Sequence, residues 1–357
     1  MQHKILFADQ LRALAIFFVL LAHYFGVFWY DPSILHYTNI SPYLVDRTVP
    51  AYVPFVNPTF IPYLNWGPLG VDIFFLISGF VIPISLERYT WKQFAIQRIL
   101  RLYPTYFVGF LFLVSMILLS AYYFHNPFMY HWSTIVKHAI IGGRELASLP
   151  SIDTVVWTLE VELKFYILSA IFIVWFKKKS LYIFFIPAML ALLLYYMLPT
   201  FFTTIHVIYM YIGTVFYYHF RSQVQTRYAV VIAVCIFLLF SIVYFLLGKG
   251  YFPEAYLYQM VANGIYALAI FTLAYYLRRK FTYNRYIGFV SGISYPFYVI
   301  HSVSGYVLMF IGIDLGLSPA LSMMIALCII VSVAYLLHRY IEIPSQRLGK
   351  KLTKTIK

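Results

Sequence analysis

The sequence predicts an all-α protein that crosses a membrane about ten times. Of its 357 residues, 62% are hydrophobic, 21% are aromatic and 11% are charged. Ordinary soluble domains are about half apolar and about a quarter charged, so a soluble fold could not hide this much apolar surface. Continuous apolar stretches of about 20 residues recur along the whole chain, and each is long enough to cross a bilayer. We therefore expect a multi-pass protein whose first partner is the lipid bilayer.

Ten apolar segments are the expected membrane spans. In chain order they are residues 9–30, 67–86, 103–124, 158–176, 181–198, 203–220, 228–247, 257–277, 287–312 and 318–338. The rest of the chain forms tails, short connections and two long loops, about 31–66 and 125–157. No linker separates a second domain, so we expect a single membrane domain over residues 1–357.

The positions of Lys and Arg predict the direction of the spans. If the N-terminus is cytoplasmic, nearly all Lys and Arg of the tails and loops fall on the cytoplasmic side. Those left outside are Arg47, Lys137, Arg144 and Lys249. This asymmetry follows the positive-inside rule and predicts that both termini are cytoplasmic. It also explains the net charge of +14, so nucleic-acid binding is not expected.

Cysteine usage and the N-terminal segment exclude two further classes. Cys235 and Cys328 both lie inside expected spans and form no CxxC or CxxxC pattern, so neither a disulfide nor a metal site is expected. The first span lacks the small-residue cleavage site of a secretory signal peptide, so we expect it to remain in the membrane.

The first span carries two ionisable residues on one face. In ADQLRALAIFFVLLAHYF (8–25), Arg12 and His23 are 11 residues apart. Eleven residues turn a helix only about 20° beyond three full turns and advance it about 16.5 Å. Arg12 therefore lies near the cytoplasmic edge and His23 in the outer third of the core. Ionisable groups are costly in hydrocarbon, so they indicate a functional site.

The first long loop is rich in proline and aromatic residues. Its prolines are Pro32, Pro42, Pro50, Pro54, Pro58 and Pro62. Its aromatic residues are Tyr37, Tyr43, Tyr52, Phe55, Phe60, Tyr63 and Trp66. So much proline argues against a long helix. The aromatic rings suit either an interfacial belt or a lid whose rings pack on the apolar faces of a sugar.

Three further spans bring polar residues to the depth of His23. Span two carries Asp72 near its outer end, span four carries Glu160 and Glu162, and span nine carries His301. Unpaired, each would be expensive at that depth, so we expect His23, Asp72, Glu162 and His301 to face the bundle interior and to contact one another.

The cytoplasmic layer is expected to be basic. Arg98 and Arg101 lie three residues apart at the entrance to span three, close to the plane of Arg12. An Arg side chain offers several donors in a planar fork, so three converging guanidinium groups would suit a ligand that carries phosphate.

Six short motifs follow one another along the chain. They are the Arg12–His23 face, G-V-D-x-F-F-x-x-S-G-F over 70–80, the pair Arg98 and Arg101, W-[ST]-L-x-x-E over 157–162, S-Y-x-x-Y-x-x-H over 294–301 and I-E-x-P over 341–344. Together they resemble the acyltransferase 3 family of membrane enzymes, which acylate surface sugars and some other hydroxyl acceptors. The resemblance covers about residues 7–346. Pro296 departs from the pattern and is expected to kink the ninth span near His301. The hydrolase-like domain that is fused to some relatives is not expected after the tenth span.

This resemblance implies transfer of an acyl group, most often acetyl, from cytoplasmic acyl-coenzyme A to a hydroxyl group. The expected acceptor is a cell-surface or lipid-linked carbohydrate at the outer face of a bacterial cytoplasmic membrane. Acyl-coenzyme A is then a donor substrate, and no permanently bound cofactor or metal is expected.

The resemblance also implies roles for the residues that carry it. Arg12, Arg98 and Arg101 would hold the phosphates of the donor. The imidazole of His23 would act as a general base, with Asp72 or Glu162 orienting it and His301 as the fourth candidate catalytic residue. An acyl-histidine intermediate is the alternative route.

Other interpretations of the same residues remain open at this point. His23 and His301 could be hydrogen-bonded structural histidines, Arg12, Arg98 and Arg101 could be topology anchors, and Asp72 and Glu162 could serve helix packing or capping. A transporter or flippase of a glycan or lipid precursor is the rival class, because secondary carriers also bury charges among many spans. Carriers, however, show inverted repeats with paired broken helices, and neither is visible in this sequence.

Overall fold

The computed structural model describes residues 5–41, 48–57, 60–196 and 202–355. Pro42, Tyr43, Arg47 and Pro58, which the sequence analysis names, lie outside these ranges. Within them the chain forms helices and no β-strand, which confirms the all-α class.

The N-terminal half begins with α1 (Leu6–Ala22), the π-helical turn η1 (His23–Val27) and α2 (Phe28–Tyr30). The described parts of the first loop hold only short helices, α3 (Ser33–Tyr37) and α4 (Val53–Val56), as its prolines predict. There follow α5 (Trp66–Arg88), α6 (Trp91–Tyr123), α7 (Trp132–His138), α8 (Gly143–Leu146), α9 (Val156–Ile171) and α10 (Ile173–Lys177).

The second half contains η2 (Leu181–Phe185), α11 (Ile186–Tyr196), η3 (Phe202–Thr204) and α12 (Ile205–Phe220). These are followed by α13 (Thr226–Gly248), α14 (Glu254–Tyr276), α15 (Arg285–Ile300) and α16 (Val303–Asp314). The chain then continues through α17 (Pro319–Leu337), the π-helical turn η4 (His338–Glu342) and α18 (Ile343–Thr355).

Six of the described helices are long and apolar enough to cross a membrane. They are Leu6–Tyr30, α5, α6, α13, α14 and Pro319–Thr355; the pair α15 and α16 makes a seventh if the two count as one bent span. The multi-pass character is thus confirmed. The predicted segments 158–176, 181–198 and 203–220 also form helices. However, α9 and α12 have only 16 residues each and rise only about 24 Å, which is less than the roughly 30 Å of a hydrocarbon core.

Two predicted segments differ in detail from the helices that form there. The predicted span 287–312 is two helices, α15 and α16, whose axes are bent by 76° at His301 and Ser302. Pro296, where a kink was expected, lies inside α15. Helix α6 begins at Trp91, well before the predicted residue 103, because Thr90 and Gln93 form a reciprocal capping box. Arg98 and Arg101 therefore lie in the early turns of this helix, before the apolar stretch that begins at residue 103.

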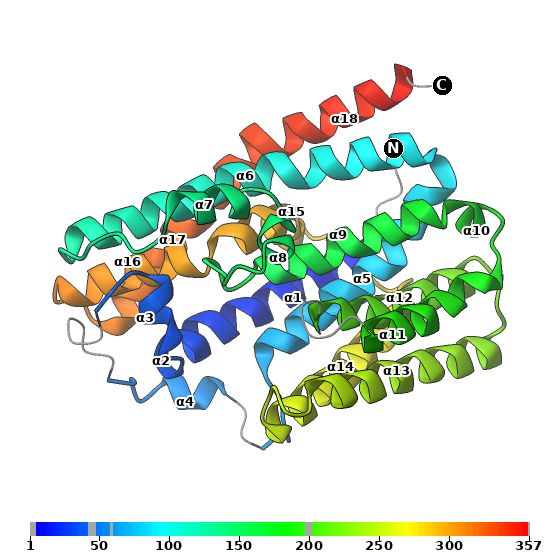
Figure 1. Cartoon of the computed structure of the whole chain (residues 1–357), viewed down its shortest axis with the longest axis horizontal. Coiled ribbons are helices and arrows are strands. Elements are labelled where there is room, and N and C mark those ends of the chain that lie inside the picture. Colours follow the sequence, from blue (N-terminus) through cyan, green and yellow to red (C-terminus); the bar gives the residue numbers. More distant parts are fainter. Residues whose placement is uncertain (1–4, 42–47, 58–59, 197–201, 356–357) are drawn as a thin grey trace.

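Helices α1 and α5 run side by side through the centre, with α12 against α5 (Figure 1). Glycines allow the close contacts between these helices. A Cβ at Gly79 would lie 1.9 Å from the Met210 carbonyl oxygen, and a Cβ at Gly213 would lie 2.2 Å from that of Leu76. The Thr214 hydroxyl adds a hydrogen bond of 3.1 Å to the Gly79 carbonyl. Small residues of this kind are how membrane helices pack closely.

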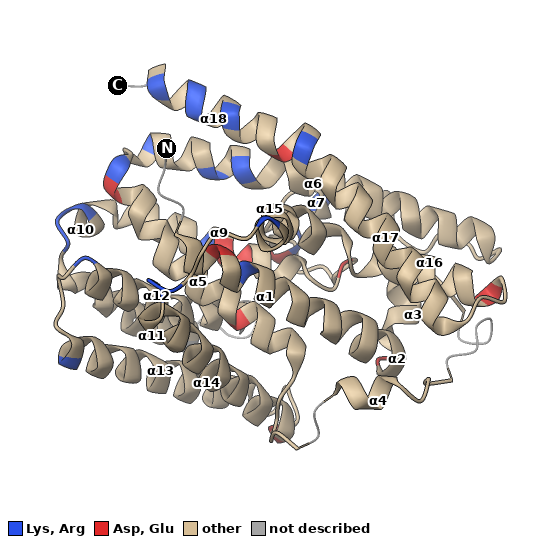
Figure 2. Ribbon diagram, turned by 180° about the vertical axis from the view of Figure 1, so that it is seen from behind, with Lys and Arg blue, Asp and Glu red and all other residues tan. Residues whose placement is uncertain are grey.

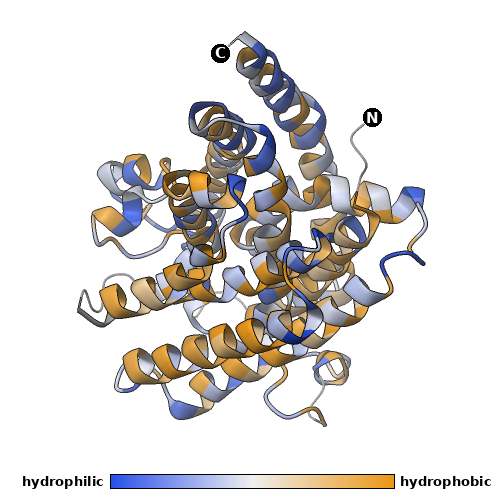
Figure 3. Cartoon of the chain, turned by 90° about the vertical axis from the view of Figure 1, so that its right-hand side faces the viewer, coloured by the Kyte–Doolittle hydropathy of each residue, from blue (hydrophilic) through white to orange (hydrophobic). Residues whose placement is uncertain are grey.

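The two ends of the bundle differ in charge. Lys and Arg gather over α18, the beginning of α6, α10 and the turn before α13 (Figure 2). We call this the basic end, and the opposite end, where α2, α3 and α4 lie, the loop end (Figure 1). Between the ends, the helix surfaces are largely apolar, while α18 is strongly hydrophilic (Figure 3). Helix α18 ends on the basic side (Figure 1).

Candidate active site

His23 lies where α1 turns into the π-helix η1. Single π-helical turns within α-helices are often found at functional sites. The Nδ1 atom of His23 is hydrogen-bonded to the hydroxyl group of Tyr306, which comes from α16. The first span therefore presents His23 to a partner that lies far away in the sequence.

His301 caps the C-terminus of α15 at the bend between α15 and α16. Its Nδ1 donates a 2.9 Å hydrogen bond to the Tyr298 carbonyl oxygen, so the proton sits on Nδ1. Its Nε2 is buried and finds no hydrogen-bond partner in the described part of the chain. The rings of His301 and His23 meet edge to face with centroids 4.6 Å apart. The structure thus brings these two predicted residues into contact.

Two tyrosines that the sequence analysis missed hold this pair. Besides the Tyr306 contact, the buried Tyr24 hydroxyl donates a 3.0 Å hydrogen bond to the His301 carbonyl oxygen. Tyr24 follows His23 directly, and Tyr306 lies five residues after His301. Spacing alone gives no signal for such contacts, because they depend on how α1 meets the bend.

No hydrogen bond joins Asp72 to His23 in the described part of the chain. Asp72 lies on α5 and faces His206 of α12, with 4.0 Å between His206 Nδ1 and Asp72 Oδ1. Asp72 and His206 are both buried, and both line the same cavity as His23. His206 could have been found from the sequence. It is an ionisable residue near the start of the predicted segment 203–220, which lies at the same end of the bundle as Asp72.

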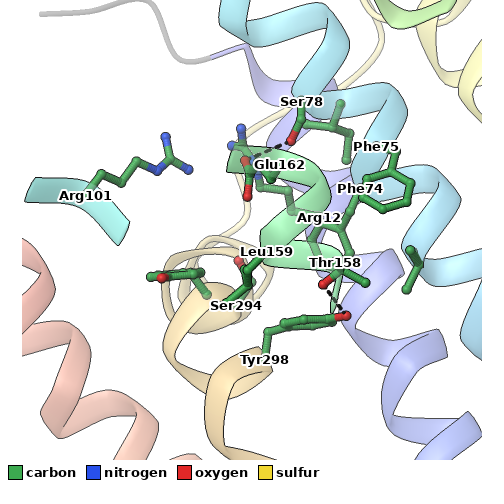
Figure 4. A pocket seen from close by; sticks show the side chains of 13 residues that line it. Arg12, Phe74, Phe75, Ser78, Arg101, Thr158, Leu159, Glu162, Ser294 and Tyr298 are labelled. Carbon is green, nitrogen blue, oxygen red and sulfur yellow. Dashed lines mark hydrogen bonds between the residues drawn. The ribbon is translucent and has the colours of Figure 1, made fainter. Parts of the chain in front are cut away.

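Glu162 is also placed differently from the prediction. It accepts hydrogen bonds from the Ser78 hydroxyl at 3.2 Å and from the Tyr166 hydroxyl. It faces the same cavity as Arg12 and Arg101 (Figure 4). Glu162 therefore lies with the arginines in this structure.

Glu160, two residues earlier on α9, turns to the other side of the helix, because two residues correspond to about 200°. It forms an ion pair with Arg144 of the short helix α8. A second ion pair joins Glu145 of α8 to Lys164 of α9, with 2.6 Å between Oε1 and Nζ. These two ion pairs attach the second long loop to α9. The pair with Arg144 gives Glu160 a structural role.

The three predicted arginines lie around neighbouring cavities. Arg12 donates from Nη1 to Asp9 Oδ1 at 2.7 Å. Arg98 donates from Nη2 to the Ser85 hydroxyl at 2.6 Å, and its guanidinium group stacks on the rings of Phe94 and Tyr166. Its Nε and Nη1 atoms are buried, and no described residue accepts a hydrogen bond from them. Such unsatisfied donors are costly, so they indicate a site for an anion.

Three cavities follow one another through the bundle. The basic-end cavity, about 290 Å³, is lined by Arg12, Arg88, Arg98, Arg101 and Lys350 among others. The middle cavity, about 90 Å³, shares Arg12 and Arg101 with it (Figure 4). The loop-end cavity, about 420 Å³, contains His23, Asp72 and His206 and shares Val71 and Tyr298 with the middle cavity.

The residues of the first loop border the loop-end cavity only in part. Asp31, Ser33 and Tyr37 line it, whereas Tyr63 and Trp66 do not. Trp66 stacks on Phe18 and donates a 2.9 Å hydrogen bond to the Val56 carbonyl oxygen. Trp66 is thus a structural residue of the loop. No group of three His, Cys, Asp or Glu that could hold a metal ion occurs in the described ranges.

Comparison with known proteins gives one match. The family whose model is described as an acyltransferase domain matches residues 5–339, nearly the whole chain. Neither the curated proteins nor the solved structures contain a match.

Proposed function

Because this chain belongs to the acyltransferase 3 family and is an acyltransferase, we propose that it acylates a carbohydrate hydroxyl across a membrane. The donor is acyl-coenzyme A, most simply acetyl-coenzyme A, and the acceptor is a cell-surface or lipid-linked glycan. The family match favours the enzyme over the transporter or flippase that the sequence alone left open.

The observation that carries the proposal is the line of three cavities, with arginines at one end and His23 at the other. Coenzyme A likewise has a charged end and an uncharged reactive end. Its nucleotide carries phosphates, and its thioester ends a long, thin arm. Arg12, Arg98 and Arg101 would hold the phosphates by charge-assisted hydrogen bonds, and the free donors of Arg98 would be satisfied. The arm would then pass the middle cavity and end beside His23.

The direction of transfer follows from the charge of the two ends. Basic segments stay on the cytoplasmic side of a membrane, which in this proposal places the basic end inside and both termini in the cytoplasm of a bacterial cell. The donor then enters from the cytoplasm, and the loop-end cavity opens outward. The predicted ten spans belong to this topology, with α9, α11 and α12 as its shorter members.

In the proposed reaction His23 is the general base. We assign it the tautomer in which Nδ1–H donates to the Tyr306 oxygen, and this leaves the lone pair of Nε2 for the acceptor. As the acceptor oxygen attacks the thioester carbonyl, Nε2 takes its proton. The C–S bond of the tetrahedral intermediate then breaks, and the imidazolium returns the proton to the departing thiolate. His301 packs against the edge of the His23 ring and keeps it in place.

A transfer assay tests this function. The protein is purified in lipid nanodiscs and incubated with acyl-coenzyme A, radiolabelled in the acyl group, and with a surface-glycan extract. Transfer of label to the glycan, with release of coenzyme A, is the expected result. Label that stays on the protein after unfolding would show the acyl-histidine route instead. Thioester that remains intact in the presence of every acceptor fraction would contradict the proposal.

A further inference from the structure

The loop-end cavity contains a histidine–carboxylate pair, which the proposed reaction does not use. His206 at the start of α12 and Asp72 of α5 are 5% and 3% exposed, and both line this cavity. Their closest atoms, Nδ1 and Oδ1, are 4.0 Å apart, which is too long for a hydrogen bond. The Nδ1 atom of His206 is buried and has no hydrogen-bond partner among the described residues. A buried polar atom of this kind requires an explanation.

The surroundings of His206 do not let its ring turn away to find another partner. The aromatic rings of Phe75, Trp157, Phe240 and Tyr244 surround it, with centroids 5.3–5.8 Å from its own. The imidazole is therefore held in one orientation beside Asp72. A fixed, unsatisfied donor next to a carboxylate is a preformed recognition site for a ligand group that can both donate and accept.

A hydroxyl group has this property. One oxygen atom can lie about 2.8 Å from both Nδ1 and Oδ1 when these two are 4.0 Å apart. The hydroxyl would donate its proton to the carboxylate and accept a hydrogen bond from Nδ1–H of His206. A thioester or a phosphate lacks the donor, so this geometry favours an alcohol.

The rest of the cavity is suited to a sugar. Its volume of about 420 Å³ is within the range of small-molecule sites. Asn65, Ser33 and Tyr256 add polar groups to its wall, and Trp157 offers a flat ring next to His206. A ring of this kind packs well on the apolar face of a pyranose.

We propose that Asp72 and His206 bind a hydroxyl of the acceptor sugar other than the one that is acylated. The pair thereby selects which hydroxyl reaches His23. This inference rests on the proposed function, since it supplies the acceptor subsite for that reaction. It assigns to Asp72 a role in acceptor binding and adds His206 to the functional residues.

Binding of 4-nitrophenyl glycosides to the protein in lipid nanodiscs tests this subsite. Glycoside detergents are avoided because they would compete. The panel comprises the glucoside, galactoside, mannoside and rhamnoside, together with their monodeoxy analogues. For the glycoside that binds best, we expect one deoxy analogue to bind at least about tenfold more weakly, the loss that corresponds to one hydrogen bond to a charged group.

The variants H206Q and D72N connect this loss to the pair. Each should weaken binding of the complete sugar about as much as the deoxy substitution does. With the deoxy sugar they should cause no further loss, because the shared contact can be lost only once. Coenzyme A binding reports on folding and should be unchanged. The matched control is H219Q in the same helix, since His219 is hydrogen-bonded to Tyr275 and lies away from this cavity.

Three results would overturn the subsite. The first is that the protein binds none of the glycosides, and the second is that the parent protein binds all deoxy analogues equally well. The third is that the loss of affinity caused by a variant adds to the loss caused by the deoxy sugar. The first two need no variant, so misfolding of a variant does not affect them. Failure of the proposed function is different. A parent protein that binds the glycoside at this pair but transfers no acyl group refutes the reaction and leaves the subsite in place.

Discussion

The Nδ1 atom of His23 is hydrogen-bonded to the Tyr306 hydroxyl, and this contact bears on which nitrogen would be the base in the proposed reaction. It directs Nδ1 toward α16 and leaves Nε2 as the atom for the acceptor hydroxyl. The neighbouring His301 keeps its proton on Nδ1 because it donates to the Tyr298 carbonyl oxygen. The two imidazoles thus have different hydrogen-bond partners although their rings are in contact.

Replacement of His23 by Ala should abolish transfer and leave membrane insertion intact. Loss of a general base costs about a hundredfold or more in rate. The measurement is the initial rate of labelled acyl transfer by the purified variant, at matched amounts of folded protein. Near-normal turnover would exclude His23 as the base.

Asp153 gives the protein a pH-dependent contribution to stability. It lies in the loop before α9, and burial raises the pKa of its carboxyl group to about 7, although the Ser302 hydroxyl donates to Oδ1 at 3.0 Å. A carboxyl group with a raised pKa in the folded state stabilises the fold fully at pH values below its ordinary pKa of about 3.9. That contribution is lost as the pH rises through about 7.

The thermal midpoint should therefore fall between pH 5.5 and pH 8 by more in the parent protein than in the variant D153N. The asparagine keeps the shape of the side chain but has no proton to lose. Thermal unfolding of both proteins, followed by circular dichroism in the same buffers, gives the comparison. Identical pH profiles would show that the Asp153 carboxyl group does not titrate in this range.

Local geometry explains which residues the sequence could place. Arg12 and His23 share one helix, so their common face follows from helical periodicity and is found in α1. The contact between His23 and His301 was expected from equal depth. Depth alone, however, could not distinguish the partners of Asp72 and Glu162, because those depend on which face of α9 and α12 turns inward.

At the scale of elements, α5 and α12 make the closest helix–helix contact that the described glycines allow. A methyl group at Gly79 would lie 1.9 Å from the Met210 carbonyl oxygen, which belongs to backbone and cannot turn aside. The variant G79A should therefore force the two helices apart and destabilise the protein by about 1–3 kcal/mol, the usual cost of overpacking.

The matched control is G292A. Gly292 also lies within a helix, but its added methyl group would meet the His338 ring at an ordinary 3.6 Å. The measurement is the thermal midpoint of both variants in nanodiscs. A G79A protein as stable as the G292A protein would show that the α5–α12 crossing can relax.

The boundaries of elements were predictable where a local signal exists. The reciprocal cap of Thr90 and Gln93 is such a signal, and it lies before the apolar stretch from which the third span was predicted. The break at His301 and Ser302 has no comparable signal in the sequence. It is stabilised by contacts from elsewhere, from Tyr24 and Asp153, so hydropathy alone reads α15 and α16 as one span.

At the scale of the whole molecule, the arginines line the basic-end cavity and His23 lines the loop-end cavity. If Arg98 and Arg101 hold donor phosphates, Arg→Ala changes should weaken coenzyme A binding by about 1.5–3 kcal/mol for each contact. Arg→Lys should recover only part of the loss, because lysine keeps the charge without the fork. The variant H23A should leave donor affinity nearly unchanged.

The measurement is a titration of each variant with coenzyme A and with its 3′-dephosphorylated form. The variants should lose discrimination between the two compounds if an arginine contacts that phosphate. A double arginine variant that binds coenzyme A as well as the parent would place the donor elsewhere. Arg98 and Arg101 would then serve only to orient the protein in the membrane.

The bend between α15 and α16 has a mechanical consequence. The hydroxyl of Tyr24 is bonded to the His301 carbonyl at the bend, and the adjacent His23 is bonded to Tyr306 beyond it. Two adjacent residues of the first span thus contact both the end of α15 and the helix α16 that follows the bend. Opening or closing the angle of 76° would pull these two bonds in different directions and change the separation of the imidazoles. The distance between the two imidazoles therefore depends on the angle between α15 and α16.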